Sequence, residues 1–214
     1  MAFKKEKTNF EQQKKHLYHY WENSRMITSD TVMKAFLAVP REFFVDNSYR
    51  DQSYADHPLP IGCEQTISQP TTVMLMLQLL EVLPGQQVLE IGSGSGYNAA
   101  LLAELSGVVV AVERHKQLVK IAQENLKQAG YEDVILVKGD GKQGYASEGP
   151  YDRIMVTAAA HQVPQKLKDQ LSIGGLLVAP IGATYGCEMK TFKKISSVNF
   201  QISGHGLFSF VPLV

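Results

Sequence analysis

The sequence predicts an α/β fold, a doubly wound, mainly parallel sheet with helices on both faces and extra helices at the N-terminus. Three observations predict it. Strand-length apolar runs alternate with helix-length segments from residue 88 onward, a glycine-rich turn follows the first run, and 214 residues suffice for one packed domain. Strands joined by helical crossovers lie parallel, so we expect a Rossmann-like sheet.

Composition narrows the class of protein. Hydrophobic residues make up 44% and charged residues 20% of the chain, and 21 basic residues balance 21 acidic ones. This balance argues against a nucleic-acid partner. The charged N-terminus and the absence of an uncharged run of about 18 residues argue against a signal peptide or membrane span. We expect a cytoplasmic monomer with no membrane partner.

One domain is expected over residues 1–214, with N-terminal helices and a loop in 1–70, a cofactor-binding core in 71–182 and C-terminal strands in 183–214. Cys63 and Cys187 are far apart and lack CxxC spacing, so we expect reduced thiols, no disulfide and no metal site.

The first elements are helical. Aromatic-studded polar residues predict a helix over 10–22, and a second helix over 31–38 has Ser29 or Asp30 as N-cap and stops before Pro40. Residues 41–70 carry several Pro and Gly residues and no sustained period, which predicts a long irregular segment. The apolar run over 71–85 predicts a buried helix.

Regular alternation follows. We expect strands at 88–91, 108–112, 134–137, 153–157 and 176–182, and helices at 98–105, 118–130 and 164–171. Pro164 suits the first position of the last helix and Gly130 suits the C-cap of the middle one.

The turn after the first strand is the expected ligand site, because ligands of open α/β sheets bind at the carboxyl ends of strands. Gly92, Gly94 and Gly96 allow a tight turn and close approach of a ligand. With Glu90 they form the pattern ExGxGxG. A carboxylate there favours a cationic ligand and repels a pyrophosphate, which suits S-adenosylmethionine.

A dinucleotide site is the alternative interpretation of this turn. The fingerprint GxGxxG fails when counted from Gly92, because Tyr97 occupies its sixth position, and counting from Gly94 leaves only the relaxed form ending at Ala99. An NAD-dependent oxidoreductase therefore stays open as a weaker alternative, as does a binding module without turnover.

Two more acids end the next two strands. Glu113 is placed to accept hydrogen bonds from ribose hydroxyls, and Asp140, followed by Gly141, can accept from an adenine amino group. Each alone also fits a plain structural role: a solvated strand-end glutamate or a turn aspartate. Acids at three successive strand ends are typical of class I methyltransferases.

The methyl acceptor is the next question. After the fourth strand the chain reads Thr157-Ala158-Ala159-Ala160, without an obvious base, and His161 more often has a structural role. A carboxylate acceptor needs no base, since an α-carboxyl with a pKa of about 3.5 is ionised at neutral pH. The loop QTISQP offers orienting groups, although it also fits a plain N-cap for the following helix.

The motifs together resemble the protein-L-isoaspartate O-methyltransferase family over about residues 35–213. The resemblance rests on PREFFV, LPIG, QTISQP, VLEIGSGSGY, AVER, GDG, YDRIMVTAAA and the terminal FVPL. It implies methyl transfer from S-adenosylmethionine to the α-carboxyl of L-isoaspartyl residues in damaged proteins, leaving S-adenosylhomocysteine.

The resemblance also assigns roles to residues. It makes Ser68 the active-site residue and places Thr157, Ala158 and Ala159 near the substrate. It implies that the cofactor contacts are Thr66, Ile67, Ser68, Glu90, Gly92, Gly94, Gly96, Glu113, Asp140 and Gly141.

This chain departs from the family pattern at several positions. Glu64 stands where many members have glycine, Thr71 where they have an aromatic residue, and Ala160 and His161 where prolines are common. A positive φ at position 64 would strain the loop. Another carboxylate or a small molecule therefore stays open as the acceptor.

Overall fold

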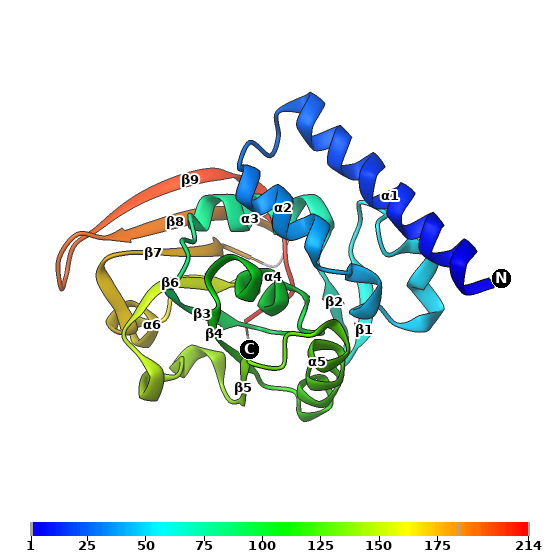
Figure 1. The fold of residues 1–214 in the computed structure, drawn as a ribbon. Coiled ribbons are helices and arrows are strands. Elements are labelled where there is room, and N and C mark those ends of the chain that lie inside the picture. Colours follow the sequence, from blue (N-terminus) through cyan, green and yellow to red (C-terminus); the bar gives the residue numbers. More distant parts are fainter. Residues whose placement is uncertain (1, 184, 214) are drawn as a thin grey trace.

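The computed structural model describes residues 2–183 and 185–213. Seven strands form one sheet in the order β5-β4-β3-β6-β7-β8-β9 (Figure 1). The first five strands in this order are parallel, and β8 and β9 are added at the β7 side as antiparallel strands. The predicted mainly parallel sheet is confirmed. The strands are β3 (Gln87–Ile91), β4 (Val108–Glu113), β5 (Ile135–Lys138), β6 (Tyr151–Val156), β7 (Leu171–Ile181), β8 (Tyr185–Lys194) and β9 (Phe200–Ser209).

Helices pack around this sheet (Figure 1). The α-helices are α1 (Ala2–Ser24), α2 (Asp30–Ala38), α3 (Pro70–Leu80), α4 (Tyr97–Ser106), α5 (Lys116–Ala129) and α6 (Gln165–Gln170). Short 3₁₀ helices are η1 (Arg41–Phe43), η2 (Asn47–Gln52), η3 (Gly141–Gln143) and η4 (Ala146–Glu148).

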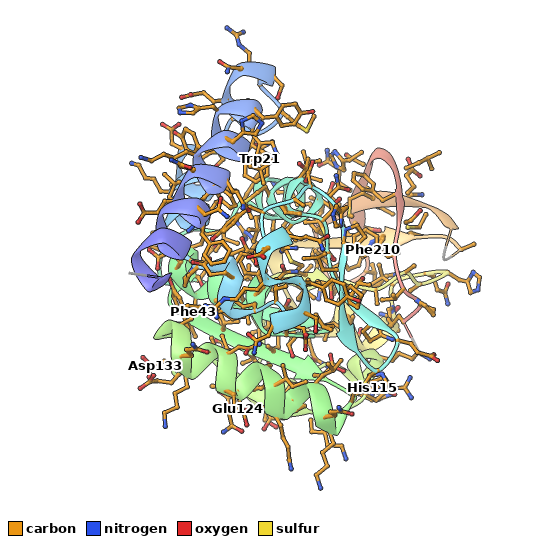
Figure 2. All side chains as sticks on the ribbon, turned by 90° about the vertical axis from the view of Figure 1, so that its right-hand side faces the viewer. Trp21, Phe43, His115, Glu124, Asp133 and Phe210 are labelled. Carbon is orange, nitrogen blue, oxygen red and sulfur yellow. The ribbon has the colours of Figure 1, made fainter. Side chains whose placement is uncertain are left out.

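Alternation of side chains along the strands divides the core in two. Val88 joins the larger cluster, which includes residues of α1 to α5, whereas Leu89 and Ile91 join a smaller one beneath α6. Strands buried on both faces read as continuous apolar runs, which is why the sequence marks them clearly. Polar side chains such as Glu124 lie on the outer surface of α5 (Figure 2).

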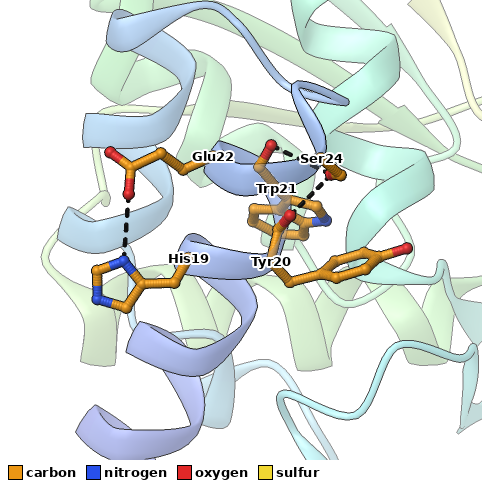
Figure 3. Close-up of polar contacts among 5 residues, drawn as sticks. All are labelled: His19, Tyr20, Trp21, Glu22 and Ser24. Atoms are coloured by element: carbon orange, nitrogen blue, oxygen red, sulfur yellow. Dashed lines mark hydrogen bonds and ion pairs between the residues drawn. The ribbon is translucent and has the colours of Figure 1, made fainter.

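The N-terminal helix is longer than the predicted span of 10–22. Its first residues, AFKKEKTNF, lack Gly and Pro and include lysines and glutamate that favour helix. Near its end, the Ser24 hydroxyl donates to the carbonyl of Tyr20 at 2.7 Å, and His19 pairs with Glu22 on the exposed side (Figure 3). Trp21 points inward and is fully buried.

The predicted irregular segment over 41–70 is wrong in part. It contains η1, η2 and a hairpin of β1 (Leu59–Gly62) and β2 (Gln65–Ile67). Cys63 and Glu64 form the turn, both with positive φ, at 51° and 58°. Because these residue types rarely adopt that conformation, the sequence carries no usual hairpin signal here. The hairpin lies beside the sheet at its carboxyl edge (Figure 1).

Candidate functional site

The glycine turn joins β3 to α4, and all three of its glycines have positive φ. A Cβ on Gly92 would lie 2.6 Å from the Thr157 hydroxyl oxygen, and one on Gly94 would lie 3.0 Å from Ile61. The missing side chains thus make room for neighbouring protein groups as well as for a ligand. The Thr157 hydroxyl donates to the carbonyl of Gly92 at 2.8 Å, which ties the end of β6 to the turn.

Glu113 ends β4 and is nearly buried. One carboxylate oxygen accepts from the Gly94 N–H at 3.1 Å and the other from the His115 N–H at 2.9 Å. These bonds hold the carboxylate directly against the glycine turn. Its predicted role as an acceptor for the ribose hydroxyls stays a prediction.

Glu90 is completely buried, on the same face of the sheet as Val88. Neither carboxyl oxygen has a hydrogen-bond partner among the described residues. Burial, and after it the charge of Glu113, raise the pKa of Glu90 to about 8, while the side chain of Asn98 opposes the shift. Its role as a direct cofactor contact stays a prediction, because it lines none of the cavities described below.

Asp140 follows β5 and caps η3, where its side chain accepts from the Lys142 N–H at 2.9 Å. Gly141 packs tightly, since a Cβ there would lie 2.4 Å from a methyl carbon of Ile91. The turn-aspartate role is therefore real, and an exposed Asp140 keeps acceptor capacity for a ligand.

Three hollows meet at this edge of the sheet. A small turn cavity of about 70 Å³ is lined by Ile61, Gln65–Ser68, Gly92–Ser95, Tyr97, Asn98, Glu113, Thr157, Ala158 and Val211. An edge cavity of about 50 Å³ is lined by Gln65, Ile91, Gly92, Val112–His115, Gly141, Ala158, Pro212 and Leu213. An outer cleft of about 820 Å³ is lined by Pro58, Glu64, Thr66, Ser68, Gln69, Thr71, Thr72, Leu75, Thr157, Gly186 and Leu207–Pro212.

Shared lining residues connect the hollows. The turn cavity and the edge cavity have Gln65, Gly92, Glu113 and Ala158 in common, so they form two ends of one site. The turn cavity and the outer cleft share Thr66, Ser68, Thr157 and Val211. Ser68 therefore lies between the small turn cavity and a wide cleft open to larger molecules.

Arg41 holds the backbone of Ser68 through a hydrogen bond. Its Nη2 donates to the Ser68 carbonyl at 2.8 Å and its Nε donates to the Ser53 carbonyl at 2.7 Å. The guanidinium stacks over the ring of Tyr97, 4.8 Å from its centre, and is fully buried. Sequence reasoning missed this residue as a site residue, although it belongs to the motif PREFFV.

The segment after β6 is tied to the C-terminal end of the described chain. The Ala159 N–H donates to the Val211 carbonyl, and the Leu213 N–H donates to the Ala159 carbonyl, both at 2.7 Å. Residues 211–213 thereby line the site, which sequence reasoning also missed; the terminal FVPL motif was its only signal.

The donors at the turn cavity fit S-adenosylmethionine. Ser93 and Tyr97 line it, and the hydroxyl of each is buried without a partner among the described residues. Unpaired buried hydroxyls of this kind suit a polar ligand. Among the described residues, no group of three or more His, Cys, Asp or Glu side chains can hold a metal. Both cysteines are free thiols, and no described helix is long and apolar enough to cross a membrane.

Comparisons with known proteins give consistent similarities along the chain. The family model for protein-L-isoaspartate(D-aspartate) O-methyltransferase matches residues 12–214. A protein-L-isoaspartate O-methyltransferase of Methanopyrus kandleri is 46% identical over 88% of this chain and 85% of its own, and one of Thermococcus sibiricus is 43% identical over 92% and 95%.

Solved structures are similar along nearly the whole chain. A Plasmodium falciparum chain assigned to the same activity, crystallised with S-adenosyl-L-homocysteine, superposes with a TM-score of 0.83 at 28% identity and covers 94% of this chain and 97% of its own. A further protein-L-isoaspartate O-methyltransferase structure gives 0.83 at 32% identity, over 93% of this chain and 65% of the other.

Proposed function

The chain belongs to the protein-L-isoaspartate(D-aspartate) O-methyltransferase family, and from this premise we propose how its residues divide the work. The enzyme transfers a methyl group from S-adenosylmethionine to the α-carboxyl of L-isoaspartyl residues in damaged proteins. In the proposal, the turn cavity and the edge cavity hold the cofactor and the outer cleft holds the protein substrate.

The cofactor site uses acids at successive strand ends. We assign Glu113 to the ribose hydroxyls and Asp140 with Gly141 to the adenine, because Glu113 and Gly141 both line the edge cavity and Asp140 directly precedes Gly141. We assign Glu90 to a hydrogen-bonding group of the cofactor, because both of its buried carboxyl oxygens lack a partner among the described residues. Thr66, Ile67 and Ser68 close the site from the hairpin side.

Methyl transfer needs the acceptor carboxylate in line with the methyl–sulfur bond. The cofactor supplies an electrophilic methyl group on a sulfonium. The acceptor is already ionised at neutral pH, so alignment rather than proton removal governs the rate. We assign this alignment to the Ser68 hydroxyl and place Thr157 and Ala158, which line the turn cavity with it, against the substrate backbone. The role of the buried Ala159 as a substrate contact stays a prediction, because it lines neither the turn cavity nor the outer cleft.

One observation carries the proposal: Ser68 is one of the few residues that line both the turn cavity and the outer cleft. The decisive experiment offers an L-isoaspartyl peptide and its aspartyl twin with labelled cofactor. Methylation of the isoaspartyl form alone is expected. Equal labelling of both peptides, or labelling only of a different carboxylate or a small molecule, would contradict it.

We further propose one domain that works as a cytoplasmic monomer without nucleic acid. The balance of 21 basic and 21 acidic residues supports the absence of a nucleic-acid partner. Light scattering of the purified chain is expected to give a mass near 23.7 kDa, and twice that mass would contradict the monomer.

A further inference from the structure

A hydrogen-bond relay joins the N-terminal helix to the wall of the outer cleft. Trp21 Nε1 donates to the Thr71 hydroxyl at 2.7 Å, and that hydroxyl donates to an Asp56 carboxylate oxygen at 2.6 Å. The other Asp56 oxygen accepts from the Thr71 N–H at 2.9 Å. Thr71 is the central member, because a hydroxyl both accepts from an indole and donates to a carboxylate.

Two of the three members of the relay, Trp21 and Thr71, are buried, whereas Asp56 is exposed. Trp21 has no solvent exposure, and its ring packs edge-on against Phe36 with 4.7 Å between ring centres. A buried indole N–H without a partner is costly, so the Thr71 oxygen has a defined position relative to α1. Figure 2 shows Trp21 on the inner side of α1, toward the rest of the domain.

The relay ends at the substrate side of the site. Thr71 is the second residue of α3, directly after Gln69 and Pro70, and it lines the outer cleft. It lines neither the turn cavity nor the edge cavity. Asp56 precedes Pro58, another lining residue, so the relay fixes two segments of the same cleft wall relative to α1.

We propose that Trp21, Thr71 and Asp56 are positioning residues for the protein acceptor, and that α1 is thereby part of the acceptor site. This inference rests on the proposed function, since it assigns the outer cleft to the substrate. The relay should act on binding of the isoaspartyl peptide and leave binding of the cofactor unchanged. Its effect should be carried by the hydroxyl of Thr71 rather than by the volume of its side chain.

The test compares three variants by KM for an isoaspartyl peptide, kcat, and the Kd of S-adenosylhomocysteine. Thr71→Val keeps the shape and removes the hydroxyl, Trp21→Phe keeps an aromatic ring and removes the N–H, and Thr71→Ser restores the hydroxyl. We expect Thr71→Val and Trp21→Phe to raise KM about fivefold or more, the equivalent of one lost hydrogen bond. The Kd should stay within about twofold, and Thr71→Ser should return KM close to that of the wild type.

Several results would overturn the inference. KM unchanged in Thr71→Val with only a lower melting temperature would make the relay merely structural. A parallel rise of KM and of the S-adenosylhomocysteine Kd, or failure of Thr71→Ser to restore KM, would do so as well. Wild-type enzyme that methylates no isoaspartyl peptide would instead refute the proposed function itself, which keeps the two failures apart.

Discussion

The guanidinium of Arg41 donates a hydrogen bond to the backbone carbonyl of Ser68, the residue assigned to align the acceptor. Arg41 is fully buried, and neither of the ion pairs found among the described residues includes it. Burying a cation without an acidic partner costs free energy, and here the buried guanidinium is used to hold neighbouring groups. It holds Ser68, Ser53 and the ring of Tyr97 in one arrangement.

Replacing Arg41 should therefore slow the reaction. Arg41→Met leaves the carbonyls of Ser68 and Ser53 without their donors and frees the loop, and we expect kcat to fall at least about tenfold and the free energy of unfolding to fall by about 2 kcal/mol. Arg41→Lys keeps the charge without the planar fork and should fall between. Steady-state kinetics and urea unfolding check both; a wild-type kcat in Arg41→Met would contradict the role.

Ser68→Ala should lower kcat by about 100-fold, because the acceptor carboxylate loses the group that aligns it. The Kd of S-adenosylhomocysteine should change little, since most lining residues of the turn cavity remain. Ser197→Ala, an exposed serine in the turn between β8 and β9, serves as a control with unchanged kinetics. An unchanged rate in Ser68→Ala would remove this residue from the mechanism.

Glu113→Ala should weaken cofactor binding. The variant loses the acceptor assigned to the ribose and both bonds to the backbone N–H groups of Gly94 and His115, so we expect the Kd of S-adenosylhomocysteine to rise at least about tenfold. Isothermal titration calorimetry measures it. Glu124→Ala, an exposed glutamate on α5, is the matched control, and equal affinities of the two variants would refute the assignment.

Glu90 should make stability depend on pH. Its pKa rises from 4.5 to about 8 on folding, so the folded state holds a proton that the unfolded state has released. The stability that this group contributes is present below pH 4.5 and is lost as the pH rises to about 8. Glu90→Gln should flatten this decline, as seen in melting temperatures measured between pH 5 and 8. Parallel curves for the two proteins would show that Glu90 is not protonated in the folded state.

The hairpin turn offers a stabilising substitution. Glu64 has a φ of 58°, which glycine adopts without strain, so Glu64→Gly should raise the free energy of unfolding by about 0.5–1 kcal/mol and the melting temperature by about 2 °C. Glu64→Ala retains the Cβ and is the matched control, with no gain expected. A melting temperature of Glu64→Gly below that of Glu64→Ala would contradict strain at this position.

Much of the sheet follows from local pattern. The strands around Val88 and Val110 are short apolar runs buried on both faces. The alternating glycines of the turn that follows the first of them indicate a tight turn between a strand and a helix. The hairpin at Cys63 and Glu64 was not predictable in this way, because its turn uses residues that usually avoid positive φ. The dinucleotide alternative fails with the family assignment.

The candidate site likewise contains residues that the sequence predicts and residues that only the structure identifies. Glu113 and Ser68 belong to motifs that can be recognised in the sequence, and both line the turn cavity. Arg41 contributes through a hydrogen bond to a residue 27 positions away, and Trp21 through one to a residue 50 positions away. Such contacts depend on how the whole chain packs, and no short-range spacing predicts them.

The strap formed by residues 211–213 has a consequence for how the enzyme fails. Its hydrogen bonds to Ala159 hold it in the lining of the turn cavity and the edge cavity. It follows β9, a largely exposed strand at the edge of the sheet. Edges of this kind fray before the interior opens. Mild heating should therefore abolish methyltransferase activity at a temperature at which most of the domain is still folded. The loss of activity then measures unfolding of the last strand rather than of the whole protein.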